Sequence, residues 1–314
     1  MPSAAIAVRD LVKIYVRRGE VAVRAVDGLT FDVPRGIIFG LLGPNGAGKS
    51  TTLKVLTTLT KPTSGGASVM GHDVAREALE VRRCMAVVIQ ESAAELFLTV
   101  RDNLLTFARF HGLAGPAART RAEAVMEQFG LTADAGRKAM DLSGGFRRRV
   151  QVAKALLVDT PVLILDEFST GMDPILKRSV MDLLRRERDR GRTIVLTTQV
   201  LSEAEELCDD ILIINRGRQV ARGDLHSLKL LSAGVYEVTV TFEELPAGLE
   251  AELAAREPIR LSIRGHTVEV ALRESEDRVL ALVGEWLRRG KVLRVEVGGA
   301  SLEDVFVDLM KESA

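Results

Sequence analysis

One stretch of eight residues constrains the fold of this chain more than any other. Residues 43–50 read Gly-Pro-Asn-Gly-Ala-Gly-Lys-Ser, which matches the pattern G-x-x-x-x-G-K-[S/T] in full. The apolar run Ile37–Leu42 precedes it, and a helical pattern over about 49–60 follows it. A glycine-rich loop between a strand and a helix directs backbone amides and a helix N-terminus at one point, where they bind an anion. We therefore predict a phosphate-binding loop in an α/β fold.

This loop supplies candidate ligands for the phosphates of a nucleotide. They are Gly43, Pro44, Asn45, Gly46, Ala47, Gly48, Lys49, Ser50 and Thr51. Lys49 is expected to reach the β- and γ-phosphates, and the Ser50 hydroxyl to bind Mg²⁺. A glycine turn that carries a lysine by chance is the alternative, which the flanking strand and helix argue against.

A second apolar strand ends in two acids. Val162–Leu165 is followed by Asp166 and Glu167. Next to the loop, Asp166 can bind Mg²⁺ directly or through water, while Glu167 can orient and deprotonate an attacking water. In isolation, a strand followed by a polar turn explains the same residues equally well. The loop upstream favours a metal ligand and a catalytic base.

The order of elements predicts two domains. Up to about residue 225, strands alternate with helices, which is typical of an α/β domain with a mostly parallel sheet, and a largely helical insertion spans about 91–140. After that point, the order βαββαβ predicts a small α+β, ferredoxin-like domain. We expect the domains to be residues 1–225 and 226–314, the second with an accessory or regulatory role. Ser301 and Asp304 are expected to cap the last helix.

Composition excludes several classes of partner. The 314 residues include 43 basic and 43 acidic side chains, so no overall positive field attracts nucleic acid or anionic lipid. The two cysteines, Cys84 and Cys208, lack the spacing of a metal site or a disulfide framework, and we expect reduced thiols. No apolar run approaches the ~20 residues that span a bilayer, so any membrane part must come from another chain.

A second glycine turn precedes a basic helix. Leu142, Ser143, Gly144 and Gly145 lead into a helix that begins near Phe146. Small residues that open a helix form a second anion site. One chain has no obvious need for two such sites, whereas two copies in head-to-tail order would each close the nucleotide of the other.

With Gln90 and Thr197-Thr198-Gln199, these motifs resemble the ATP-binding subunit of an ABC transporter, over roughly residues 5–225. The resemblance implies a P-loop NTPase of the ABC type, with an N-terminal antiparallel β subdomain and a helical insertion. It also implies ATP and Mg²⁺ as cofactors, ATPase activity, and a homodimer that closes on two nucleotides.

The resemblance also assigns roles to single residues. Tyr15 would stack on adenine, and Gln90 would contact Mg²⁺ and the attacking water. Ser143–Gly145 would bind the γ-phosphate of the ATP held by the other copy, and Asp173 would lie at the dimer seam. These expectations are implied by the family, beside the roles of Lys49 and the acidic pair.

Two positions depart from the family pattern. Phe146 stands where most members have glutamine, and its ring cannot donate the polar contact to the other copy's nucleotide. Arg147–Arg149 follow it. One alternative is that they partly compensate for that contact, but a solvated basic helix face is the expected explanation for them. Gln199 stands where most have histidine. Its amide can donate a hydrogen bond but cannot titrate, so we predict a γ-phosphate sensor without a general-acid role.

Gln199, residues 215–218 and the closing Ser301–Phe306 make the chain similar to the daunorubicin-resistance type. That resemblance implies an ABC-2 type permease as partner, export of a drug-like, lipid or other hydrophobic compound, and a cytoplasmic location on the inner face of the cell membrane, reached only through the permease. The alternative is a soluble, ATP-switched regulatory ATPase that is not coupled to transport.

Aromatic residues give a weaker signal. Trp286 lies in an apolar helical pattern, and we expect a core residue of the second domain rather than a ligand-stacking residue. Phe97, Phe107 and Phe110 fall in the helical insertion, where packing and docking of a membrane subunit both remain open.

Overall fold

The computed structural model describes residues 4–16, 21–88, 94–231 and 234–312. It consists of two compact units, Met1–Gln219 (unit 1) and Val220–Ala314 (unit 2). The division falls inside strand β10 (Arg218–Gly223), a few residues before the position that the sequence pattern suggested.

Unit 1 begins with a four-stranded antiparallel sheet in the order β2-β1-β4-β5. Its strands are β1 (Ile6–Tyr15), β2 (Val23–Val33), β4 (Ser64–Val69) and β5 (His72–Asp73). Buried and less buried side chains alternate over parts of β1 and β2, which is typical of a sheet with one face on a core. The antiparallel N-terminal subdomain is therefore confirmed.

A six-stranded sheet in the order β10-β9-β3-β8-β7-β6 forms the centre of unit 1. Its other strands are β3 (Ile38–Leu42), β6 (Met85–Val88), β7 (Val162–Asp166), β8 (Thr193–Thr197) and β9 (Asp210–Asn215). The pairs that β3, β7 and β8 make are parallel, and every residue of these three strands is buried. Since parallel strands end at the same edge, the segments after β3, β7 and β8 meet there.

Four helices accompany this sheet: α1 (Lys49–Leu56), α2 (Ala78–Arg83), α6 (Pro174–Asp189) and α7 (Leu201–Leu207). Leu53, Val55 and Leu56 of α1 join one apolar core with side chains from both sheets. Helix α1 is thus fixed between the sheets, and it ends four residues earlier than the sequence pattern suggested. The backbone turns out of the helix at Thr58, which has φ 63°.

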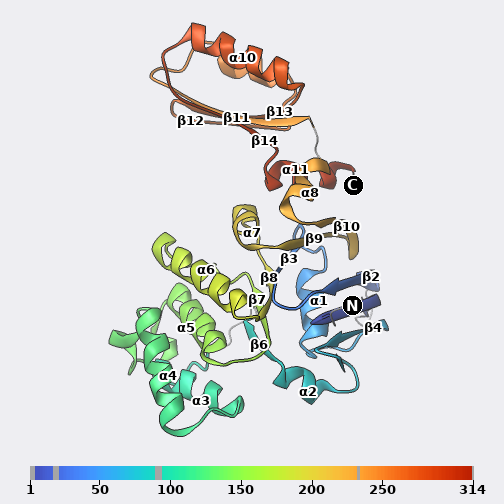
Figure 1. Cartoon of the computed structure of the whole chain (residues 1–314), viewed down its shortest axis with the longest axis vertical. Helices are drawn as coiled ribbons and strands as arrows, with labels where there is room; N and C mark the ends of the chain where they lie inside the picture. Colours follow the sequence, from blue (N-terminus) through green and yellow to red (C-terminus); the bar gives the residue numbers. More distant parts are fainter. Residues whose placement is uncertain (1–3, 17–20, 89–93, 232–233, 313–314) are drawn as a thin grey trace. The chain divides into compact units, whose positions relative to one another are not determined.

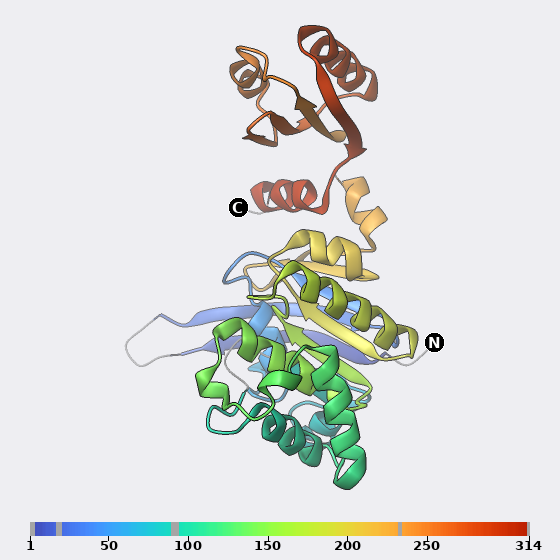
Figure 2. The same cartoon turned by 90° about the vertical axis from the view of Figure 1, so that its left-hand side faces the viewer.

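A helical segment lies on the side of the parallel sheet away from β1, β2 and β4 (Figures 1 and 2). It contains α3 (Val100–Phe110), α4 (Gly115–Gln128) and α5 (Gly144–Leu157), with single 3₁₀ turns at Thr132–Asp134 and Ala139–Asp141. The Thr99 hydroxyl caps α3 by accepting a hydrogen bond from the Asp102 amide. Buried Asn103 holds the preceding turn by bonding Glu95, Leu98 and Thr99.

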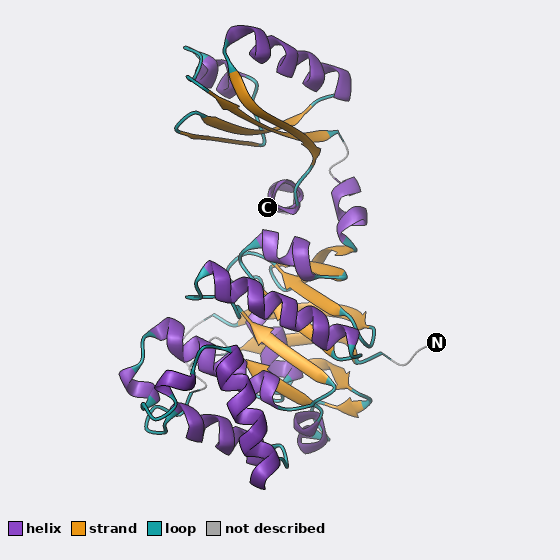
Figure 3. Ribbon diagram, turned by 60° about the vertical axis from the view of Figure 1, so that its left-hand side comes forward, coloured by secondary structure: helices purple, strands orange, loops and turns teal. Residues whose placement is uncertain are grey.

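Unit 2 contains one antiparallel sheet in the order β12-β13-β11-β14 (Figure 3). Its elements are α8 (Leu225–Leu231), β11 (Val235–Phe242), α9 (Leu249–Ala255), β12 (Arg260–Arg264), β13 (Thr267–Arg273), α10 (Glu276–Arg289), β14 (Val292–Gly299) and α11 (Leu302–Glu312). From β11 to β14 the order is βαββαβ, so the ferredoxin-like arrangement is confirmed. The sequence interpretation had missed β10 and α8.

The sheet of unit 2 carries helices on both faces. Helices α9 and α10 pack on one face around Trp286, which is 1% exposed, so its core position is confirmed. Helix α11 packs on the other face through Val305 and Leu309. The Ser301 hydroxyl accepts a hydrogen bond from the Asp304 amide, and the Asp304 carboxylate accepts one from the Ser301 amide. This reciprocal cap is the one that the sequence predicted.

Among the described residues, no helix is both long and apolar enough to cross a membrane.

Candidate nucleotide-binding and catalytic site

The loop 43–50 runs from the end of β3 into the first turn of α1, as its sequence predicted. Gly48 has φ 107°, and a Cβ atom there would lie 2.4 Å from the main-chain oxygen of Ala25. Any side chain would therefore push the loop away from β2. The first amides of α1 stay directed at the loop's concave side, where an anion is favoured.

Lys49 lies beneath this loop with 7% of its surface exposed. Its Nζ donates hydrogen bonds to the main-chain oxygens of Gly43 (2.6 Å) and Pro44 (3.0 Å). Burial lowers the pKa of Lys49, while Glu167 and Asp166 oppose the lowering. A partly desolvated ammonium next to the loop amides is suited to bind phosphate oxygens, because removing water strengthens its field.

The acidic pair ends strand β7, on the same sheet edge as the loop. Asp166 is buried, and its Oδ1 accepts a hydrogen bond from the Thr197 hydroxyl at the end of β8. Glu167 has φ 52°, a conformation that non-glycine residues rarely adopt, and its amide donates to the Thr197 main-chain oxygen (3.0 Å). Strained backbone of this kind concentrates at functional sites. Thr197 is a supporting residue that the sequence interpretation did not identify.

Gln199 contacts the second acid. Its Nε2 donates a hydrogen bond to Oε1 of Glu167 at 2.5 Å. Thr198, one residue earlier, donates to buried Glu203 (2.8 Å), which also accepts from Ser169 (3.0 Å). The segment after β7 and the segment after β8 are thereby tied together through a residue of α7.

These parts line one cavity of about 390 Å³. Its lining comprises Tyr15, Val23, Ala25, residues 45–51, Glu167 and Gln199. The Tyr15 ring is 38% exposed, and Lys13 Nζ lies 5.0 Å from its centroid. Tyr15 also borders an adjoining hollow with Val16, Val21 and Val23. A flat aromatic ring at one end and an anion loop at the other suit a nucleotide.

The oxygen ligands suit Mg²⁺ rather than a metal held by protein alone. Ser50 and Asp166 offer a hydroxyl and a carboxylate, and the described residues contain no group of three or more His, Cys, Asp or Glu side chains that could hold a metal ion. Magnesium commonly binds through one or two protein oxygens together with substrate phosphates. Gln90, the third predicted metal contact, lies outside the described residues.

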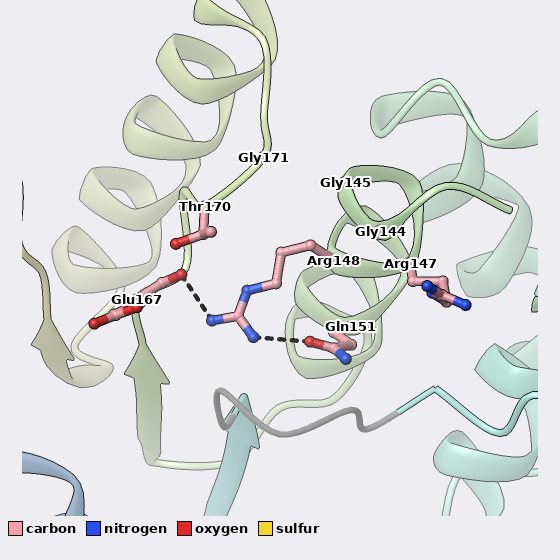
Figure 4. Close-up of a pocket in the computed structure, with 8 residues that line it drawn as sticks. All are labelled: Gly144, Gly145, Arg147, Arg148, Gln151, Glu167, Thr170 and Gly171. Carbon is pink, nitrogen blue, oxygen red and sulfur yellow. Dashed lines mark hydrogen bonds between the residues drawn. The ribbon is translucent and has the colours of Figure 1, made fainter.

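A second cavity, of about 420 Å³, lies at the N-terminus of α5 (Figure 4). Its lining comprises Gly144, Gly145, Arg147, Arg148, Gln151, Glu167, Thr170 and Gly171. Ser143 caps the helix by accepting a hydrogen bond from the Phe146 amide (3.3 Å). A Cβ atom at Gly145 would lie 2.2 Å from the main-chain oxygen of Gly171, so only glycine fits this close approach.

The interpretation of Arg147–Arg149 as a solvated helix face is wrong for Arg148. That side chain is 8% exposed and extends from α5 toward Glu167 (Figure 4). It donates hydrogen bonds to the main-chain oxygens of Asp166 and Glu167 (2.7 Å) and to Oε1 of Gln151 (2.8 Å). Burial lowers the pKa of Arg148, while the two acids oppose the lowering. The main chain of the acidic pair is therefore held by a side chain of α5.

The neighbouring basic residue also has a partner. Arg149 Nη2 donates to Oδ2 of Asp173 at 2.9 Å, and its guanidinium lies 5.1 Å from the Phe146 ring centroid. Asp173 Oδ1 caps α6 by accepting a hydrogen bond from the Leu176 amide. The hydrogen bond from the Leu176 amide and the nearby Arg149 charge lower the pKa of Asp173. Phe146 thus packs beside a cation in the position where glutamine was expected.

Comparisons with known proteins agree with this geometry. The family model described as ABC transporter matches residues 26–170. The daunorubicin/doxorubicin resistance ATP-binding protein DrrA of Streptomyces peucetius is 37% identical over 98% of this chain and 93% of its own length. A Nod factor export ATP-binding protein I of Burkholderia lata is 40% identical over 98% of both chains.

Solved structures show the same likeness for the larger unit. The ATP-binding subunit of an ABC transporter superposes with a TM-score of 0.67 at 29% identity, covering 72% of this chain and 92% of that one. A dimeric ATP-binding cassette in a post-hydrolysis state with ADP and phosphate gives a TM-score of 0.66 at 25% identity, covering 70% and 98%. The chain therefore belongs to the ABC transporter family and is one of its ATP-binding, ATP-hydrolysing proteins.

Proposed function

We propose that this chain is the ATPase that powers a separate ABC-2 type membrane permease, which exports a drug-like, lipid or other hydrophobic compound. The observation that supports this most is the extent of the similarity. Relatives whose names refer to daunorubicin resistance and Nod factor export match over 98% of the chain, so the similarity includes unit 2 as well as the nucleotide-binding unit. No observation favours the alternative of a regulatory ATPase without a transport partner.

The proposed chemistry is phosphoryl transfer from ATP to water. Tyr15 stacks on adenine, and the loop amides with Lys49 hold the phosphates. Ser50 and Asp166, together with Gln90, would hold Mg²⁺, which would supply charge neutralisation at the phosphates. Glu167 orients and deprotonates the water, and Gln199, which contacts Glu167, donates to the γ-phosphate. Hydrogen-bond donors that are oriented before the reaction supply a large part of the rate enhancement in many enzymes.

The placement of the second glycine turn supports a homodimer. Gly144 and Gly145 border a cavity at the N-terminus of α5, whose lining shares Glu167 but no residue of the loop with the loop cavity of the same chain. We propose that Ser143–Gly145 of one copy bind the γ-phosphate held by the other, with Asp173 at the seam. Two ATP molecules then lie between two copies, and hydrolysis lets the two copies separate.

The exporter proposal is tested with the chain in its native membrane. We expect the chain to lie on the inner face of the cell membrane, bound only through the permease, and to bind no nucleic acid. Affinity purification in mild detergent should recover a multi-span membrane protein. Inside-out vesicles should accumulate a fluorescent anthracycline when ATP is added, and vesicles that carry Lys49→Ala should not. Recovery from the soluble fraction alone, without a membrane protein, would contradict the proposal.

A further inference from the structure

Strand β14 forms one edge of the sheet in unit 2 and is unusually open. It pairs with β11 on one side, and no other described strand pairs with it on the other. Six of its eight residues are exposed and the other two are partly exposed. It contains no proline or lysine, and its one register shift lies near its start, between Val292 and Arg294. An open edge of this length is a template for another strand.

The sequence of β14 is complementary to itself. Residues 293–297 read Leu-Arg-Val-Glu-Val, with the charges on either side of Val295. Antiparallel pairing of two copies around Val295 sets Arg294 of each opposite Glu296 of the other; Leu293 lies at a register shift of β14 and is left out of this pairing. Antiparallel pairing centred on Arg294 would instead place the two Arg294 side chains opposite each other, and pairing centred on Glu296 would do the same with the two Glu296 side chains. Opposite charges across strands stabilise a pair and like charges destabilise it, so one register is favoured.

The opposite edge of the same sheet provides an internal comparison. Strand β12 reads Arg-Leu-Ser-Ile-Arg from Arg260 to Arg264. Antiparallel pairing of two β12 strands around Ser262 would set Arg260 against Arg264 twice. The two edges therefore differ: a second copy would meet like charges at β12, where Arg260 is already paired with Asp304, and opposite charges at β14.

Exposed apolar side chains gather beside β14. Leu280 and Leu287 of α10 are 53% and 52% exposed, and Leu293 and Val297 of β14 are 62% and 40% exposed. Val297 pairs with Val238, a core residue beneath α9 and α10, so its side chain lies on the helix-bearing face. The strand and the helix thus present apolar groups on the same side of the sheet.

Helix geometry places the two leucines toward the β14 edge. Arg289, on α10, bonds Glu252 of α9 and the main-chain oxygen of Ala247, and α9 packs on β12. Leu287 precedes Arg289 by two residues, a little over half a helical turn, so it points away from α9. Leu280 shares its face because it lies seven residues earlier. Figure 2 shows α10 and β14 together on the side of unit 2 away from α9.

From these observations we propose that two copies of this chain associate through unit 2, by antiparallel pairing of β14 around Val295 to give one continuous eight-stranded sheet. The two α10 helices then face each other across the two-fold axis, with Leu280 and Leu287 against their counterparts. This contact needs no nucleotide, which separates it from the proposed ATP-dependent contact of unit 1. It would keep two copies together between rounds of hydrolysis.

Charge exchange on β14 tests the proposal with the full chain, freed of nucleotide by apyrase, in sedimentation velocity experiments. The wild-type chain should dimerise reversibly. Arg294→Glu or Glu296→Arg sets like charges opposite each other twice, and should weaken dimerisation about tenfold or more. The double variant R294E/E296R should restore it. Arg264→Gln on the β12 edge is the matched control and should change nothing.

A disulfide test reports the register. In a chain with Cys84→Ser and Cys208→Ala, Val295→Cys should give a covalent dimer on mild oxidation, because opposite residues of antiparallel strands lie within disulfide distance. Ser262→Cys, at the centre of the other edge, should not. The proposal is overturned if the nucleotide-free wild-type chain is monomeric at about 100 μM. It is equally overturned if the double exchange stays as dissociated as the single variants.

Discussion

The Arg148 guanidinium donates a 2.7 Å hydrogen bond to the main-chain oxygen of Glu167, the proposed base. This bond joins Glu167 to α5, the helix that begins at the second glycine turn. The same group also bonds the main-chain oxygen of Asp166. Glu167 has φ 52°, which needs support from surrounding structure. Arg148 is therefore a positioning residue: it holds the backbone from which the carboxylate projects.

We expect Arg148→Met to lower kcat about 10- to 100-fold, the effect of losing a charged hydrogen bond worth about 1.5–3 kcal/mol at the site. KM for ATP should change little, because Arg148 lies outside the loop cavity. Arg148→Lys should recover part of the rate, since lysine supplies the charge but not the planar fork. Steady-state ATPase kinetics give both constants.

The matched control is Arg192→Met, which removes another buried arginine. Arg192 donates hydrogen bonds to Ala155, Thr160 and Glu187. Neither Asp166 nor Glu167 is among these partners. It should lower Tm while kcat per folded molecule stays unchanged. If the two variants lose kcat equally, Arg148 has no positioning role.

Much of the site could be predicted because its signals are local. The strand before the loop and the strand before Asp166 are continuous apolar runs, and both lie in the parallel sheet within one residue of their predicted bounds. Parallel topology then brings their carboxyl ends together. The family, and the residue roles that it implies, could be predicted from the order of the motifs along the chain, since no single motif specifies this family.

The role of Arg148 could not be predicted from a run of three arginines. All three have the same side chain, and the helical phase does not distinguish them, because residues 150–157 of the same helix are all buried. The contact between Gln199 and Glu167 joins the ends of two strands 32 residues apart and depends on tertiary structure alone.

Glu167→Gln should bind ATP with nearly unchanged affinity and hydrolyse it more than about 100-fold more slowly, because the amide cannot accept the water's proton. The ATP-bound dimer should then accumulate, which size-exclusion chromatography with ATP detects. Glu123→Gln, an exposed change on α4, is the control. A normal hydrolysis rate in Glu167→Gln would show that another group is the base.

Gln199→Ala should slow hydrolysis, because it removes the proposed donor to the γ-phosphate. Gln199→His should introduce a pH dependence that the glutamine lacks. Below the imidazole pKa of about 6.5, a protonated histidine would pair with Glu167 and occupy the base, so kcat should fall as the pH falls. Rates measured between pH 5.5 and about 8.5 bracket this pKa. Wild-type turnover in Gln199→Ala would remove the sensor role.

Lys49→Met should abolish ATP binding without destabilising the free chain. Burial lowers the pKa of Lys49. At neutral pH the charged ammonium therefore destabilises the folded state. This destabilisation disappears only as the pH rises through the folded-state pKa toward the unfolded value of about 10.4. At pH 7 the Tm without ATP should equal or exceed that of the wild type. ATP should raise Tm in the wild type and in Lys61→Met, but not in Lys49→Met. A large loss of Tm without ATP would contradict this reasoning.

Asp304→Ala should strongly destabilise unit 2. The Asp304 carboxylate is fully buried, accepts hydrogen bonds from the Ser301 amide (3.0 Å) and hydroxyl (2.6 Å), and pairs with Arg260 at 3.3 Å. Its removal leaves the Arg260 charge partly uncompensated and uncaps α11, at a cost of about 2–4 kcal/mol. Glu303→Ala removes an exposed carboxylate 3.6 Å from the same arginine, and should cost less than about 1 kcal/mol. Urea unfolding measures both. Equal losses would mean that Asp304 acts only as one more surface charge, and that the cap does not hold α11 on the sheet.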